Sequence, residues 1–128
     1  MRLLLDSDVL LWAAEDSKRL TAQARRLIAN IENERFFSAA SLWELAIKRG
    51  LGREDFQVDI PSLRRGLLGN SYQELPVRGE HAIFAMSLPP IHKDPFDRML
   101  IAQATLEGMT LLTADPIVAK YAGPVRKV

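Results

Sequence analysis

Met1-Arg-Leu-Leu-Leu-Asp-Ser-Asp-Val-Leu-Leu-Trp12 decides the fold of this chain. The apolar run that ends at Leu5 is typical of a strand buried on both faces of a sheet. Asp6 ends this run, and apolar residues return from Val9 to Trp12. The pattern predicts a central strand with the Asp6 carboxylate at its C-terminal tip and a helix directly after it. Open α/β sheets bind ligands at that edge, so Asp6 is a candidate site residue, whereas Asp8 is explained as a helix cap.

The composition is that of an ordinary globular domain, because 48% of the 128 residues are hydrophobic and 26% are charged. We expect one domain over residues 1–128. No apolar run reaches the roughly 18 residues of a membrane span, and an aspartate interrupts the N-terminal run too early for a signal peptide. The absence of cysteine excludes disulfides and thiolate metal sites, which favours a cytoplasmic protein. The net charge of +1 predicts no overall attraction to nucleic acid.

Buried strands alternate with amphipathic helices along the chain. Expected helices cover residues 7–14, a segment capped by Thr21, and residues 39–50, 61–68, 79–87, 95–107 and 117–121; expected strands cover residues 3–5, 35–38, 72–77, 109–113 and a segment near Val125. Residues 53–59 read as a polar connection, and Pro76 makes the strand at 72–77 an edge strand or a strand end. The alternation predicts an α/β fold with a central, mainly parallel sheet between two layers of helices.

The helix over residues 39–50 contains a candidate acid. Ser41 and Glu44 fit a capping box, with the serine at the N-cap and the glutamate three residues later. This would explain Glu44 completely. However, a glutamate in the first turn of a helix that follows a strand lies on the same sheet edge as Asp6, so Glu44 is also a candidate site residue.

The helix over residues 79–87 is expected to bury Ala82, Ile83 and Met86. His81 has no partner nearby in the sequence. We therefore expect a surface position for His81 rather than a role as a ligand.

A second informative stretch runs from Leu88 to Ala104. Asp94 is expected to cap a helix that has Pro95 at its first position and Asp97 in its first turn. Capping is a sufficient explanation of Asp94. Asp97 is explained only in part by a favourable helix dipole, worth about 0.3–1 kcal/mol.

Asp115 follows the buried strand at residues 109–113. A turn before Pro116 is one explanation of it. In a parallel sheet, however, the strand ends with Asp6 and Asp115 and the helix starts with Glu44 and Asp97 share one edge. Two carboxylates about 4 Å apart repel by roughly 4 kcal/mol at an effective dielectric near 20, so such a group needs protons or cations. Oxygen ligands favour Mg²⁺, with Mn²⁺ as an alternative.

Four blocks together resemble the PIN-domain ribonucleases, and most closely the VapC-type toxins of bacterial toxin–antitoxin modules. They are Leu-Leu-Leu-Asp6-Ser-Asp-Val-Leu-Leu-Trp, Ser38-Ala-Ala-Ser-Leu-Trp-Glu44, Lys93-Asp-Pro-Phe-Asp97-Arg-Met-Leu-Ile-Ala-Gln-Ala and Leu-Leu-Thr113-Ala-Asp115. The resemblance extends over essentially the whole chain. Two positions depart from the family pattern, since Asp8 stands where many relatives have a neutral residue or histidine, and Ala114 replaces a residue that is often polar.

The resemblance implies a Mg²⁺-dependent endoribonuclease. Asp6 and Asp97 would be the principal metal ligands, Glu44 and Asp115 would complete the acidic site, and Asp94 lies close enough to assist. Lys93 and Arg98 flank the site and are the first candidates for contacts with RNA phosphates, ahead of Lys48 and Arg49.

The resemblance also implies a cognate antitoxin and a homodimer. The apolar side chains near the two tryptophans exceed what two short helices need to cover a sheet, so a groove that accepts an antitoxin segment is expected. These side chains are Leu10, Leu11, Trp12, Leu42, Trp43, Leu45 and Ile47.

Two alternatives remain open from the sequence. Asp6-Ser-Asp8-Val resembles the nucleophile motif of haloacid-dehalogenase-type phosphatases, but Lys93 and Thr113 match the remaining motifs of that class poorly. Hydrolysis of p-nitrophenyl phosphate would distinguish a phosphatase from a nuclease. The other alternative is a non-catalytic interaction module that binds a structural ion, which only an RNA cleavage assay separates from an enzyme.

Overall fold

The computed structural model describes residues 1–51 and 58–128. Five strands form one sheet in the order β3-β2-β1-β4-β5, and every neighbouring pair is parallel. The strands are β1 (Arg2–Leu5), β2 (Glu34–Ser38), β3 (Gln73–Leu75), β4 (Thr110–Thr113) and β5 (Val125–Lys127). The predicted parallel α/β fold is confirmed, with β1 at the centre of the sheet and the weak strand β3 at its edge.

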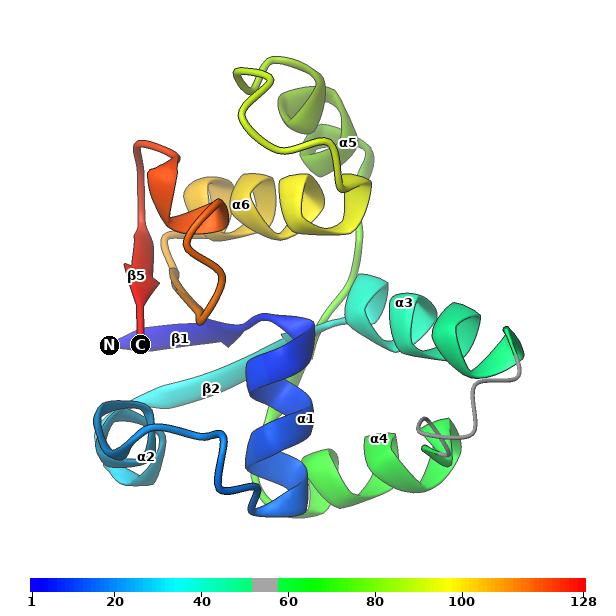
Figure 1. Cartoon of the computed structure of the whole chain (residues 1–128), viewed down its shortest axis with the longest axis vertical. Helices are drawn as coiled ribbons and strands as arrows, with labels where there is room; N and C mark the ends of the chain where they lie inside the picture. The colour runs from blue at the N-terminus through cyan, green and yellow to red at the C-terminus, as the bar shows by residue number, and fades with distance from the viewer. Residues whose placement is uncertain (52–57) are drawn as a thin grey trace.

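Helices cover both faces of the sheet and give the three layers seen in Figure 1. The helices α5 (Gly79–Met86) and α6 (Pro95–Glu107) lie on one side, and α1 (Ser7–Glu15), α2 (Ala22–Ala29) and α4 (Ile60–Gly69) lie on the other. The helix α3 (Ala39–Gly50) contacts α1, α4 and α6, and a 3-10 turn, η1 (Val118–Lys120), precedes β5.

The apolar run of β1 supplies both cores. Leu3 and Leu5 belong to the core beneath α1, α2 and α4, whereas Leu4 faces the opposite core, where α6 contributes Leu100 and Ile101. All five side chains are inaccessible or nearly so. Full burial of each leucine stabilises the fold by about 1.5–3 kcal/mol, which explains why this strand is apolar on both faces.

The strand order places a topological switch between β1 and β4. The chain runs outward from β1 to β2 and β3, and then crosses back so that β4 pairs with the other side of β1. In open α/β sheets, ligands bind outside the carboxyl ends of the strands at such a point. Asp6 directly follows β1 and Asp115 lies two residues beyond β4, so both stand at this switch point.

The helix α1 begins at Ser7, as predicted, but its capping residue differs from the prediction. Asp6 is the N-cap, and its Oδ1 accepts a hydrogen bond from the Val9 amide at 2.9 Å. Asp8, which was expected to be the cap, is an exposed residue in the first turn of α1. The helix begins directly at the end of β1, so the last residue outside it is Asp6.

The predicted capping box of α3 is wrong. Ser38, the last residue of β2, is the N-cap, and its Oγ accepts a hydrogen bond from the Ala40 amide at 3.0 Å. Glu44 therefore lies in the second turn rather than the first. Ser41 is buried, and among the described residues its hydroxyl has no hydrogen-bond partner.

The helix α5 buries a different face from the one expected. Ile83 and Met86 are 70% and 82% exposed, whereas His81 is fully buried. His81 Nδ1 accepts a hydrogen bond from the Arg78 amide at 3.0 Å, and Nε2 lies 2.9 Å from Glu107 Oε1. The Arg78 amide belongs to the local turn, and Glu107 belongs to α6. Together they provide partners for both ring nitrogens, which explains why a polar residue occupies the buried face of α5.

The apolar residues near the tryptophans do not form one groove. Leu10 and Leu45 are buried in the structure, while Trp43 is 66% exposed and meets Phe96 of α6 edge-on, with the ring centroids 5.7 Å apart. A hollow of about 500 Å³ lies beside Trp43. It is lined by Ala39, Ala40, Trp43, Val77, Pro95, Phe96 and Met99.

The expected connection at residues 53–59 falls largely outside the described residues, which exclude 52–57. Asp59 is described and caps α4 through a hydrogen bond from the Ser62 amide. No described helix combines the length and apolar character needed to cross a bilayer.

Candidate active site

A small hollow opens at the switch point of the sheet, with a volume of about 210 Å³. Its lining is almost entirely polar: Asp6, Ser7, Asp8, Glu44, Lys48, His92, Asp94, Asp97 and Asp115. The structure thus brings together the four carboxylates that the sequence singled out, although they come from α1, α3, α6 and the loop after β4. We call this hollow the acidic pocket.

Asp6 is held at the base of the acidic pocket by the junction of β1 and α1. Its backbone amide donates to Leu112 O of β4 at 3.0 Å, which extends the strand pairing by one residue. The pKa of the Asp6 carboxyl is raised to about 6, chiefly by burial and also by the charges of Asp8 and Glu44, although hydrogen bonds from Thr113 and Val9 act to lower it. Asp6 therefore combines the local role of a cap with a place in the acidic pocket.

Glu44 is fixed by two contacts from different helices. Ser7 Oγ donates to Glu44 Oε1 at 2.5 Å, and Lys48 Nζ lies 3.6 Å from Glu44 Oε2. Lys48 lies one turn further along α3, so the two side chains form an ion pair on the same face of the helix. Both contacts restrain Glu44 in its position on the wall of the pocket.

Among the acids of the pocket, Asp97 has the largest rise in pKa. The pKa of its carboxyl is raised to about 8, first by burial and then by the charges of Asp94, Asp6, Glu44 and Asp115. Asp94 is the N-cap of α6, as predicted, because its Oδ1 accepts from the amides of Phe96 at 2.9 Å and Asp97 at 3.4 Å. Near neutral pH the metal-free pocket therefore keeps a proton on one of its acids.

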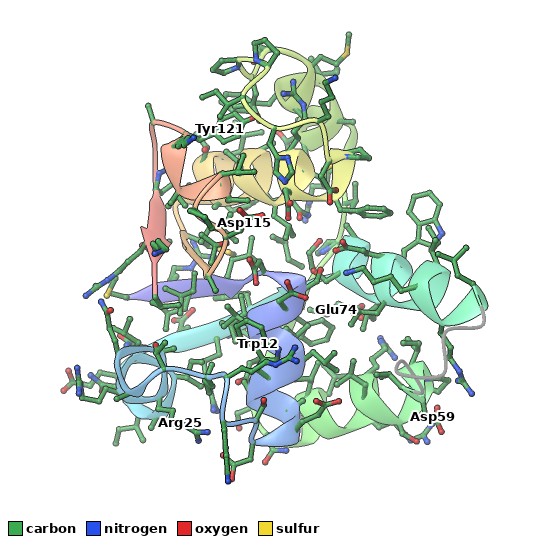
Figure 2. The ribbon with its side chains drawn as sticks, viewed as in Figure 1. Trp12, Arg25, Asp59, Glu74, Asp115 and Tyr121 are labelled. Atoms are coloured by element: carbon green, nitrogen blue, oxygen red, sulfur yellow. The ribbon has the colours of Figure 1, made fainter. Side chains whose placement is uncertain are left out.

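The two carboxylate oxygens of Asp115 have different contacts: one forms a turn, and the other faces the acidic pocket. Oδ1 accepts a hydrogen bond from the Ile117 amide at 2.8 Å, which forms the turn that the sequence predicted around Pro116. Oδ2 faces His92 Nε2 at 3.7 Å. Figure 2 shows Asp115 between the sheet and α6, and it lines the acidic pocket with the other three acids.

His92 is the pocket residue that the sequence reasoning missed. Its Nε2 lies 2.9 Å from Asp97 Oδ2, and its backbone is bound by Tyr121, whose hydroxyl accepts from His92 N at 2.8 Å. The only signal in the sequence is its place two residues before Asp94, in a loop without periodicity. The closeness of His92 in the sequence to the candidate acids Asp94 and Asp97 is a signal that marks it as a further candidate.

The two cations expected to bind substrate lie elsewhere. Arg98 does not line the acidic pocket, and it donates to the carbonyl oxygens of Ala85 at 2.9 Å, Leu88 at 3.0 Å and Pro89 at 3.0 Å. Its guanidinium therefore binds the end of α5 and the loop that follows it. Lys93 is exposed and does not line the pocket, whereas Lys48 does.

The donor set fits a hard divalent cation. Carboxylate oxygens dominate the lining of the pocket, and ligand atoms of His92, Asp94 and Asp97 lie within 4.8 Å of one another. The raised pKa of Asp97 has the same cause as cation affinity, namely several negative charges held close together with little water. The pocket thus has the charge and the ligand types that Mg²⁺ and Mn²⁺ bind.

The parallel sheet with an acidic pocket at its switch point defines a class of α/β proteins whose carboxylates could hold a metal ion. The family follows from comparison with known proteins. A model of the PIN domain family matches residues 3–124, so the chain belongs to the PIN domain family. This assignment excludes the haloacid-dehalogenase alternative. No curated protein sequence matches the chain significantly.

Several solved structures share this fold. VapBC2 from Rickettsia felis, bound to a promoter DNA fragment, superposes with a TM-score of 0.71 at 13% identity, covering 100% of this chain and 99% of that one. DNA-bound VapBC from Salmonella typhimurium gives 0.67 at 14% identity, with 99% and 98% covered. Mycobacterium tuberculosis VapC20, a toxin that cleaves the sarcin-ricin loop, gives 0.62 at 17% identity, with 94% and 96% covered.

Proposed function

We propose that this protein is a metal-dependent endoribonuclease that uses Mg²⁺ or Mn²⁺ to hydrolyse RNA phosphodiesters. The observation that carries the proposal is the meeting of Asp6, Glu44, Asp97 and Asp115 in one pocket at the switch point of the sheet. Asp6 caps α1 and Asp115 forms a turn, but neither local role requires that the four side chains meet. Membership of the PIN family and the fold shared with VapC20 support the same reading.

The residues of the pocket would have different roles in hydrolysis. Asp6 and Asp97 would hold the cation, with Glu44 and Asp115 completing the site. A bound divalent cation supplies charge that neutralises the scissile phosphate and makes a water molecule more acidic. Glu44, restrained by Ser7 and Lys48, would orient the attacking water. In-line attack leaves a 5′-phosphate and a 3′-hydroxyl.

Substrate binding needs positive charge beside the pocket as well. Lys48 lines the pocket and pairs with Glu44 at 3.6 Å, so its ammonium lies where an RNA phosphate would approach. Lys93, exposed beside the N-terminus of α6, is the second candidate. These cations would contact phosphates, which position the RNA without selecting its sequence.

Incubation of the purified protein with total RNA tests the activity. Cleavage is expected with Mg²⁺ or Mn²⁺ and not with EDTA, and mapped fragments should carry 5′-phosphates. Asp6→Asn is isosteric but neutral, so it should abolish cleavage and leave the circular dichroism spectrum unchanged. Full activity of Asp6→Asn at limiting Mg²⁺ would exclude Asp6 from the site, and cleavage in EDTA would exclude metal dependence. No cleavage under any condition would favour a non-catalytic module.

We further propose that the protein is the toxin of a toxin–antitoxin pair and acts in the cytoplasm. A solved structure with this fold is a toxin–antitoxin complex from Klebsiella pneumoniae, and others are VapBC structures from Rickettsia felis and Salmonella typhimurium. The exposed Trp43 and the hollow beside it offer apolar surface to a partner protein. A basic side chain of the antitoxin near the acidic pocket would compete with the cation and inhibit cleavage.

Co-expression with the adjacent open reading frame tests this second step. The tagged protein should recover a small partner that relieves growth inhibition, and size-exclusion chromatography of the complex should show whether the toxin is a homodimer. Trp43→Ser should weaken recovery of the partner without changing RNA cleavage by the free protein. If the chain is harmless when expressed alone and recovers no partner, the toxin proposal fails while the nuclease proposal stands.

A further inference from the structure

We propose that His92 is a direct metal ligand in the acidic pocket, and that this nitrogen ligand makes the site prefer Mn²⁺ over Mg²⁺. The inference rests on the proposed function, because both require a cation in the pocket. It adds a fifth residue to the four acids and states which of the two ions the pocket binds more tightly.

The position of the imidazole is that of a ligand. His92 Nε2 lies 2.9 Å from Asp97 Oδ2 and 3.7 Å from Asp115 Oδ2, so it stands between two acids of the pocket. Neighbouring ligands of an octahedral ion with bonds of about 2.1 Å are about 3 Å apart. These separations therefore let one ion reach the imidazole and both carboxylates with small side-chain movements.

The imidazole is held in place through its backbone. The Tyr121 hydroxyl accepts from His92 N at 2.8 Å and donates to His92 O at 3.2 Å, and Arg98 Nη1 lies 3.3 Å from the same hydroxyl. Tyr121 is 4% exposed, and Figure 2 shows it on the C-terminal segment beside α6. Tyr121 and Arg98 thus fix the backbone at His92 and act as positioning residues for its side chain.

The chemistry of the ligand sets the preference between metals. Mg²⁺ binds oxygen ligands and dehydrates reluctantly, whereas the transition metals accept imidazole nitrogen more readily. Mn²⁺ also accepts carboxylates, so a pocket of several acids and one imidazole suits it. A pocket of acids alone would not distinguish the two ions in this way.

His81, the other histidine of the chain, would not account for a metal-bound imidazole nitrogen. His81 is fully buried, and both of its ring nitrogens have partners, the Arg78 amide and Glu107. The chain contains two histidines, so a metal-bound imidazole nitrogen is attributable to His92.

Calorimetric titration with Mn²⁺ and with Mg²⁺ gives the first readout, and electron spin-echo spectroscopy of bound Mn²⁺, which detects a coordinated ¹⁴N nucleus, gives the second. Wild type, His92→Gln, Tyr121→Phe and Asp97→Asn are compared after circular dichroism has verified their fold. The glutamine replaces the nitrogen with an amide oxygen of similar reach. Asp97→Asn is the reference that should lose both ions.

Wild type should bind Mn²⁺ more tightly than Mg²⁺ and show the ¹⁴N signal. His92→Gln should lose the signal and roughly 10- to 100-fold of the Mn²⁺ affinity, since even an outer-shell partner is typically worth that much, and it should lose less of the Mg²⁺ affinity. Tyr121→Phe should shift in the same direction by less. Tighter or unchanged Mn²⁺ binding in His92→Gln would overturn the inference, because His92 would then only hydrogen-bond to Asp97. If wild type bound neither ion, the metal-dependent function would fail with it.

Discussion

Ser7 Oγ donates to Glu44 Oε1 at 2.5 Å and ties the first turn of α1 to α3. This bond joins the two helices that carry Asp6 and Glu44 to the acidic pocket, and both of its partners are buried. A hydrogen bond to a buried charged group contributes more to stability than one between neutral groups. Ser7 is therefore a structural part of the pocket although it carries no charge.

Ser7→Ala should lower the free energy of unfolding by about 1.5–3 kcal/mol, because Glu44 then loses its hydroxyl partner inside the protein. Urea denaturation measures the change. Ser41→Ala is the matched control, since the Ser41 hydroxyl is equally buried but has no partner among the described residues. It should be neutral or stabilising. Equal losses in the two variants would contradict a special role for the Ser7–Glu44 bond.

The metal-free protein should lose stability as the pH rises from about 4 to about 8. The folded pKa of Asp97, about 8, exceeds its ordinary value of 3.8, so between these values the folded chain binds more protons than the unfolded chain. Stability is therefore highest below the lower value and falls up to the higher one. Denaturation in EDTA at pH 5, 6.5 and 8 measures the slope.

Asp97→Asn should flatten that slope, and added Mn²⁺ or Mg²⁺ should restore stability at pH 8 in the wild type only. Asp6, with a pKa of about 6, leaves a smaller slope in the variant at the acid end of the range. The same pH dependence in Asp97→Asn and wild type would show that another group is responsible.

Asp94 and Asp97 should respond differently to the same substitution. Asp94→Asn should reduce RNA cleavage only mildly, because asparagine caps a helix as well as aspartate does and the amides of Phe96 and Asp97 keep their acceptor. Asp97→Asn should lose at least about 100-fold, since a direct ligand should matter more than an outer-shell residue. Initial rates on one RNA substrate decide the order, and a reversed order would make Asp94 the ligand.

Arg98→Lys should destabilise the protein by about 1–3 kcal/mol although it keeps the charge. Lysine does not reproduce the planar fork that donates to Ala85, Leu88 and Pro89. Arg64→Lys is the control, because Arg64 sits in an exposed pair with Glu74 and should leave stability nearly unchanged. If Arg98 served only to bind phosphate, Arg98→Lys would alter KM for RNA and leave stability intact.

Local sequence signals predicted most of the fold. The Leu3–Leu5 run, the Asp94-Pro95 start of α6 and its stop at Gly108, which has a φ of 66°, are each decided by residues a few positions apart. The convergence of the four acids followed from these elements, because a parallel sheet collects strand ends and helix starts at one edge.

The remaining features depend on contacts that no local pattern contains. Ser38 and Ser41 are both good caps, and only the meeting of β2 with α3 selects the first. His81 is buried because Glu107, 26 residues away, accepts from its ring. His92 lies in a loop, where neither helical nor strand periodicity marks the direction of its side chain.

The strand order also sets when the acidic pocket can exist during synthesis. Asp6 is made first, but its neighbour across the switch point is Asp115, and β4 must pair with β1 before the two approach. A nascent chain that has completed β1, β2 and β3 still lacks Asp97 and Asp115. Any activity that needs all four acids is therefore withheld from translation intermediates, so the ribosome releases a chain that becomes competent only on completing its fold.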